Sequence, residues 1–95
     1  MKSKNEYIEI LAAELRELSS QIDALTAKTE VAAAQAKLNY AEDLAALRAK
    51  RQVAVEKMQE LEAHGGEAWE ELKDTAEMVW GDLRIGLASV VAKFK

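Results

Sequence analysis

The chain has 95 residues, no cysteine, no proline and a formal net charge of −4, with both signs mixed along its length. These properties exclude a disulfide framework and a thiolate metal site, and they leave no basic block for nucleic acid. The abundance of alanine, leucine, glutamate, lysine and glutamine is typical of long helices. We therefore expect an all-α protein with no nucleic-acid partner.

The first predicted helix begins near Asn5, because Ser3 and Glu6 fit a capping box in which each side chain satisfies a free backbone donor of the first turn. Its first third carries a heptad row of apolar side chains, which is typical of a coiled coil. This row consists of Ile8, Leu11, Leu15, Leu18, Ile22 and Leu25. We expect it to pack against a second copy of itself, since one short helix is not enough to cover it all.

Beyond Leu25 the heptad row fails, and apolar residues recur at steps of 11 through Ala36, Leu47 and Met58. Eleven residues make almost three helical turns, so this row stays on one face of a nearly straight helix. The change of period falls between residues 26 and 36, where small side chains allow either a tightly packed seam or a bend. We expect one continuous helix over residues 5–64, roughly 90 Å long at 1.5 Å per residue.

The clear break in the sequence is Gly65-Gly66, because glycine ends helices and lets the chain turn. An amphipathic second helix is predicted over residues 67–94. The same step of 11 residues separates Trp69 from Trp80. Helical aromatic stripes usually cover a core, and a docking face is the alternative. The sequence leaves open whether this helix folds back as a hairpin or extends to another chain.

Two interior glycines of the second helix, Gly81 and Gly86, each cost about 1 kcal/mol relative to alanine. We expect the close approach of another helix to compensate for them.

No catalytic, metal, cofactor or small-molecule substrate site is expected. The only histidine, His64, is interpreted as the cap of a helix C-terminus, because no second ligand has a suitable spacing. Candidate nucleophiles such as Ser19, Ser20 and Ser89 have no partner base. The acidic residues that open the second helix suit its first turns and are interpreted as a solvated face: Glu67, Glu70, Glu71, Asp74 and Glu77.

No apolar stretch approaches the roughly 20 residues that span a bilayer, so we expect no transmembrane helix. The charged N-terminal residues do not fit a signal peptide, and we expect a cytoplasmic protein. The second helix could instead lie on a lipid surface, although its first half is acidic and anionic lipid prefers Lys and Arg.

Three C-terminal elements resemble a known group of proteins: Gly-x-Ala-Trp-Glu-Glu-Leu-Lys at residues 66–73, Val-Trp-x-Asp-Leu at 79–83 and Ala-Lys-Phe-Lys at 92–95. With the charged segment before them, they are similar to small bacterial coiled-coil proteins, some of which are described as stress-response proteins. The resemblance implies a helical protein without a catalytic site or cofactor. The chain departs from the pattern at Gly81 and over residues 85–91, where it is more apolar.

These observations together predict a helical hairpin that assembles into an oligomeric bundle and acts as a non-enzymatic structural or interaction protein. The alternative is a peripheral lipid-surface or hydrophobic-particle binder. The residues expected to mediate self-association are Ile8, Leu11, Leu15, Leu18, Ile22, Leu25, Trp69, Leu72, Trp80, Leu83 and Phe94.

Overall fold

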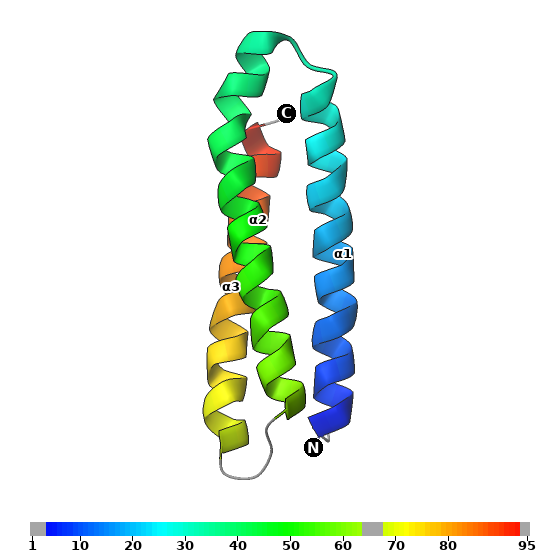
Figure 1. Cartoon of the computed structure of the whole chain (residues 1–95), viewed down its shortest axis with the longest axis vertical. Coiled ribbons are helices and arrows are strands. Elements are labelled where there is room, and N and C mark those ends of the chain that lie inside the picture. The colour runs from blue at the N-terminus through cyan, green and yellow to red at the C-terminus, as the bar shows by residue number, and fades with distance from the viewer. Residues whose placement is uncertain (1–3, 64–67, 94–95) are drawn as a thin grey trace.

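Over the described residues, 4–63 and 68–93, the computed structural model contains three helices that run up, down and up again (Figure 1). The first helix is α1 (Lys4–Glu30), the second is α2 (Ala34–Ala63) and the third is α3 (Ala68–Lys93). The helices pack against one another along their lengths, so the fold is the predicted all-α bundle.

The prediction of one continuous helix over residues 5–64 is wrong, because the chain reverses at residues 31–33. The outer limits of the predicted helix agree with the structure to within one residue, because α1 begins at Lys4 and α2 ends at Ala63. The longest dimension of the molecule is 51 Å instead of the roughly 90 Å expected from 1.5 Å per residue. Reversal allows α2 to cover the apolar face of α1 within one chain.

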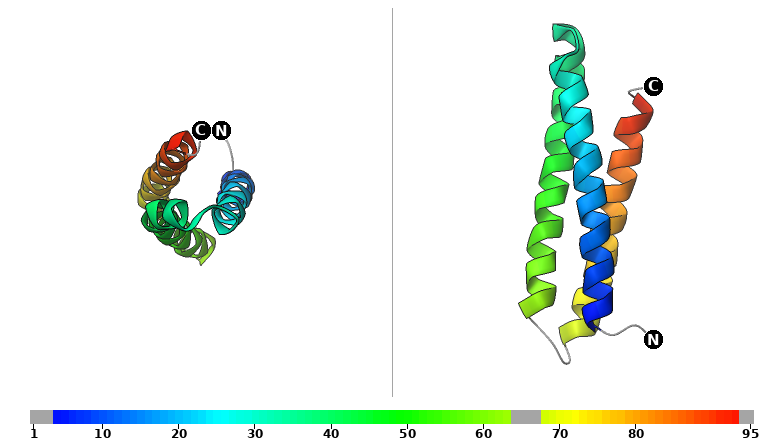
Figure 2. Two further views of the ribbon diagram at one scale, coloured as in Figure 1. Left: turned by 90° about the horizontal axis from the view of Figure 1, so that it is seen from above. Right: turned by 90° about the vertical axis from the view of Figure 1, so that its right-hand side faces the viewer.

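The core is a continuous cluster of apolar side chains from all three helices, and each buried leucine in it contributes on the order of 1.5–3 kcal/mol. Seen from above, α2 lies between α1 and α3, and α1 and α3 make the sparsest contact of the three helix pairs (Figure 2). The buried members are Leu11, Leu18, Ile22, Leu25, Leu44, Leu47, Ala54, Met58, Leu61, Ala76, Trp80, Leu83, Leu87 and Val90.

The second predicted helix agrees with α3 over the described residues, and it folds back along α2 instead of extending away. The sequence-based predictions on the cap at Ser3, the cap at His64, the Gly65-Gly66 turn, the solvated position of Glu67 and the contact of Phe94 lie outside the described residues.

Most residues predicted to mediate self-association form the core of the single chain. Leu11, Leu18, Ile22, Leu25, Trp80 and Leu83 are buried, and Ile8, Leu15, Trp69 and Leu72 are partly buried against them. The premise that a second copy must cover the heptad row is therefore wrong, because α2 and α3 of the same chain cover it.

The two interior glycines of α3 have different surroundings. A Cβ atom at Gly86 would lie 3.3 Å from Cδ2 of Leu47, so α2 does approach closely there, as predicted. A Cβ atom at Gly81 would meet nothing within 4 Å, and the predicted close approach is wrong at that position. Gly81 faces open space on the outer side of α3.

The pair supplies a matched test. Gly81→Ala should stabilise the fold by about 0.5–1 kcal/mol, because alanine loses less backbone entropy in a helix and meets no neighbour. Gly86→Ala should gain less or lose stability, since Leu47 must shift to make room. Urea denaturation followed by circular dichroism measures both changes. Equal stabilisation by the two substitutions would contradict the close packing at Gly86.

Candidate functional site

Trp80 ties α3 to α1. Its side chain is fully buried, and the indole N–H donates a hydrogen bond to the backbone carbonyl of Leu11, with an Nε1–O distance of 3.1 Å. A buried indole donor without a partner would carry a desolvation penalty, so this bond fixes which part of α1 lies over α3. A second link lies at the surface, where Arg84 Nε is 3.1 Å from Glu14 Oε2.

An aromatic cluster closes the lower end of the α1–α3 contact. The rings of Tyr7 and Trp69 meet edge to face, with centroids 5.6 Å apart. The Tyr7 hydroxyl donates to Glu77 Oε1 at 3.3 Å, and Lys73 Nζ lies 5.3 Å from the centre of the Tyr7 ring. Burial, with a further contribution from Glu77, raises the pKa of Tyr7 to about 12.

Polar contacts hold α3 to α2 at the surface. Lys50 Nζ lies 3.2 Å from Asp82 Oδ1, and Lys93 Nζ lies 3.0 Å from Asp43 Oδ2. The Tyr40 hydroxyl donates to the carbonyl of Lys93 at 2.8 Å and so caps the end of α3. Exposed ion pairs contribute little each, so these contacts adjust the register of the helices more than they stabilise the fold.

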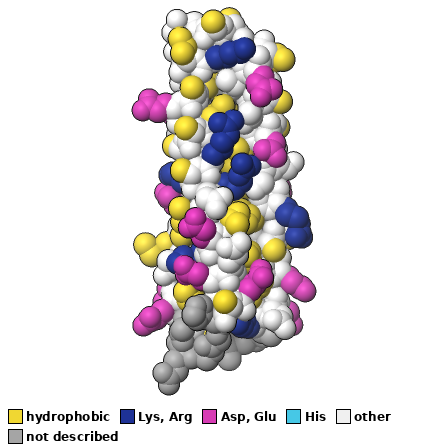
Figure 3. All heavy atoms as spheres, in the orientation of Figure 1, with side chains coloured by type: hydrophobic (Ala, Val, Ile, Leu, Met, Phe, Trp, Pro, Cys, Tyr) yellow, Lys and Arg dark blue, Asp and Glu magenta, His cyan; other side chains and the backbone are white. Residues whose placement is uncertain are grey.

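An open groove of about 580 Å³ lies between α1 and α2, and all of its lining residues come from these two helices. Its apolar lining comes from Ala12, Leu15, Val55 and Met58, and its polar lining comes from Arg16, Ser19, Ser20 and Asp23. In the space-filling view, Lys and Arg side chains gather over the upper and middle parts of the face that is turned to the viewer (Figure 3). The groove is thus an apolar furrow with charged groups at its edge.

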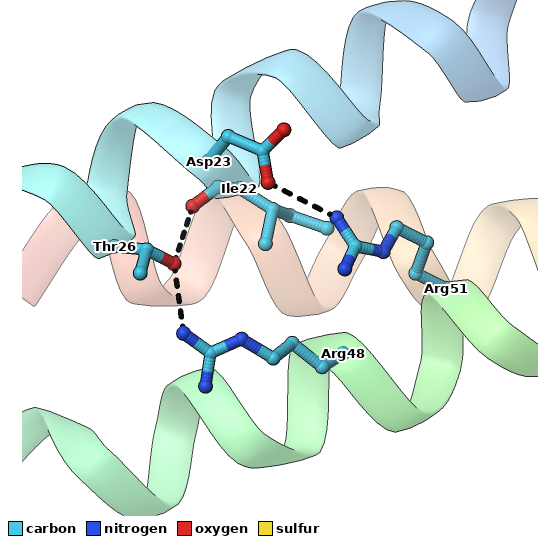
Figure 4. A network of polar contacts seen from close by, with 5 residues as sticks. All are labelled: Ile22, Asp23, Thr26, Arg48 and Arg51. Carbon is cyan, nitrogen blue, oxygen red and sulfur yellow. Dashed lines mark hydrogen bonds and ion pairs between the residues drawn. The ribbon is translucent and has the colours of Figure 1, made fainter.

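Two arginines of α2 cross to α1 at the upper end of this groove (Figure 4). Arg51 Nη1 lies 3.2 Å from Asp23 Oδ1, and Arg48 donates to Thr26 Oγ1 at 3.1 Å. The Thr26 hydroxyl in turn donates to the carbonyl of Ile22 at 3.0 Å. These bridges separate the groove from a smaller hollow of about 270 Å³, to which Thr29, Lys37 and Leu44 contribute.

Two of the candidate serine nucleophiles, Ser19 and Ser20, line the groove beside Asp23. The histidine that could serve them as a base, His64, lies outside the described residues. Within residues 4–63 and 68–93, no three His, Cys, Asp or Glu side chains come together as metal ligands. No helix in the same part of the chain has the length and apolar character needed to cross a membrane.

Comparison of the chain with protein-family models, with curated proteins and with solved structures finds no match. The resemblance to bacterial coiled-coil proteins therefore stays a prediction. Over the described residues, the chain is an all-α three-helix bundle.

Of the groove residues, Leu15 belongs to the predicted self-association set, but the sequence did not indicate that the others join it in one surface. Ala12 and Ser19 are small, and Val55 belongs to an apolar row, so each is unremarkable on its own helix. They form one surface only because the chain reverses at residues 31–33 and brings α1 beside α2. The hydrogen bond from Trp80 to the Leu11 carbonyl was also not predicted, because a local sequence pattern does not indicate a contact between residues so far apart in the chain.

We expect Trp80→Ala to destabilise the fold by about 3–5 kcal/mol, because it leaves a large cavity in the core. Trp80→Phe should cost less, since it keeps an aromatic ring and loses mainly the bond to Leu11. Urea denaturation measures both. Trp69→Ala, at a partly exposed position, serves as the control, and a cost equal to that of Trp80→Ala would contradict the anchoring role of Trp80.

Alkaline pH should weaken the fold through Tyr7. The folded chain holds the phenol proton more tightly than the unfolded chain, so this contribution is complete below pH 10 and is lost as pH rises from 10.0 towards about 12. Tyr7→Phe should therefore show a smaller loss of stability over this pH range. Urea denaturation at several pH values gives the comparison, and parallel losses for both proteins would contradict it.

Proposed function

We propose that the chain is a non-enzymatic interaction protein that self-associates through the groove between α1 and α2. The single observation that supports this function is an apolar furrow with no helix of the described chain lying in it. Laying a helix into such a groove completes a four-helix arrangement and removes apolar surface from water. Bulky Leu15 and Met58 alternate there with small Ala12 and Ser19, which suits interlocking side chains.

Charge complementarity favours a second copy as the occupant. Arg16 and Asp23 lie on the groove edge of α1, on either side of Ser19 and Ser20. If two α1 helices pack antiparallel about a two-fold axis between these serines, Arg16 of each chain faces Asp23 of the other. The small serines let the helices approach closely at the axis. Asp23 already pairs with Arg51, but its side chain is 74% exposed and leaves room for a second cation.

The lipid-surface alternative has less support. The apolar face on which it depends contains Trp80, Leu83 and Leu87, which are buried in the bundle. Met78 and Ile85 are exposed on α3, but the carboxylates of Glu77 and Asp82 line the same surface hollow and would repel anionic lipid. Scaffolding or assembly under stress, a bacterial source and a cytoplasmic location stay parts of the proposal.

The test compares two valines of α2. Val55→Glu places a charge in the groove and should shift the chain from dimer to monomer, lowering the association constant at least tenfold, which corresponds to about 1.4 kcal/mol. Val53→Glu is the matched control, because Val53 does not line the groove and is already 47% exposed. Light scattering coupled to size exclusion, over a range of protein concentrations, gives the mass. A monomeric wild-type chain at every concentration would overturn the proposed function.

Charge reversal tests the two-fold arrangement itself. Arg16→Asp sets two carboxylates against each other across the axis and should weaken the dimer. Adding Asp23→Arg restores opposite charges and should recover part of the affinity, within the 0.2–1 kcal/mol or so that exposed pairs contribute. If the double variant is no better than the single one, the second copy does not pack about Ser19 and Ser20.

A further inference from the structure

The turn between α1 and α2 contains none of the residues that normally end a helix. Residues 31–33 are Val-Ala-Ala, with no glycine, asparagine or proline, and Ala34 continues the run. Ala33 occupies the cap position of α2, where Ser, Thr, Asp or Asn is preferred, and the first turn of α2 has no acidic residue. The local sequence therefore favours a helix where the structure has a turn.

Few contacts hold this turn in place. Its backbone makes hydrogen bonds from Ala32 N–H to the Thr29 carbonyl at 3.1 Å and from Lys37 N–H to the Ala33 carbonyl at 3.0 Å. Val31 is 86% exposed, so its side chain contributes little packing. The reversal is maintained by the packing of α1 on α2 and α3, and not by the turn itself.

The core faces of α1 and α2 are also in phase across the turn. Two rows of residues continue through it at steps of 11, which is almost three helical turns. One row is Leu11, Ile22, Ala33, Leu44 and Val55, and the other is Leu25, Ala36, Leu47 and Met58. A hairpin does not require this phase, because each of its helices can rotate independently. A continuous helix does require it if both core faces are to lie on one side.

We propose that residues 31–33 are a hinge at which α1 and α2 join into one helix, and that two such opened chains exchange their α1 helices. Each α1 then packs on α2 and α3 of the second copy. In this dimer the Trp80 indole of one chain donates to the Leu11 carbonyl of the other, and Glu14 pairs with Arg84 between chains. Every core contact is kept, and only the hinge changes conformation.

This proposal goes beyond groove-mediated association, because it concerns which chain supplies α1 and not which face a partner covers. The groove forms again between the α1 of one chain and the α2 of the other. High protein concentration during folding favours exchange, since the closed form is unimolecular and the exchanged form is bimolecular.

Cross-linking distinguishes the two forms, and the chain has no cysteine of its own. The test pair is Glu14→Cys with Arg84→Cys, whose native side chains lie 3.1 Å apart across the α1–α3 contact. The control pair is Lys50→Cys with Asp82→Cys across the α2–α3 contact, which stays within one chain in both forms. Each variant is refolded from urea at low and high protein concentration, separated by size exclusion and treated with a short bis-maleimide.

Exchange predicts that the dimer fraction of the test pair gives covalent dimers on a denaturing gel, whereas the dimer fraction of the control pair gives monomers. A test-pair dimer with links only within chains overturns exchange and leaves groove-mediated association standing. Absence of any dimer overturns both proposals.

A hinge variant completes the test. Ala34→Pro is compatible with the first position of α2 but breaks a continuous helix, so it should abolish the covalent dimer and keep the helical monomer. Ala34→Gln, which is compatible with both forms, is the control. Covalent dimers that persist in Ala34→Pro would overturn the hinge.

Discussion

The hydrogen bond between the Trp80 indole and the Leu11 carbonyl is the contact on which the arrangement of the bundle depends. α2 packs broadly on both of its neighbours, whereas α1 and α3 meet along a sparser contact that needs a specific link. Trp80 provides it, since a large buried ring fills the space and its single donor selects one carbonyl. The Tyr7–Trp69 pair and the Arg84–Glu14 ion pair then lie where this register places them.

The helical class and most helix limits could be predicted from the sequence, because the spacing of apolar residues is a local property of each helix. The heptad row from Ile8 to Leu25 does face the core, and the limits of α3 agree with prediction over the described residues. The sequence left a bend open between residues 26 and 36, but it did not predict a full reversal of the chain. The alanines at residues 31–33 have high helix propensity, and packing overrides that preference. The prediction that a second copy covers the heptad row was wrong for the same reason, because the reversal brings α2 of the same chain against α1.

The candidate groove could not be predicted for the same reason. It is made from the edges of two helices, and its small residues are significant only once those edges are adjacent. Its lining comes from α1 and α2 alone, and no helix of the described chain lies in it. The disagreement between local preference and tertiary structure at residues 31–33 is of the kind that concentrates at positions with a role beyond stability.

The burial of Trp80 has an optical consequence. Its ring is shielded from water only while an α1 helix covers it, and in an exchanged dimer the second copy supplies the same cover and the same carbonyl. The fluorescence emission of Trp80 therefore does not depend on which chain provides α1. It changes only in a state in which no α1 helix covers the ring. A closed monomer and an exchanged dimer would have nearly the same tryptophan spectrum, and the passage between them would show as a transient shift to longer wavelength.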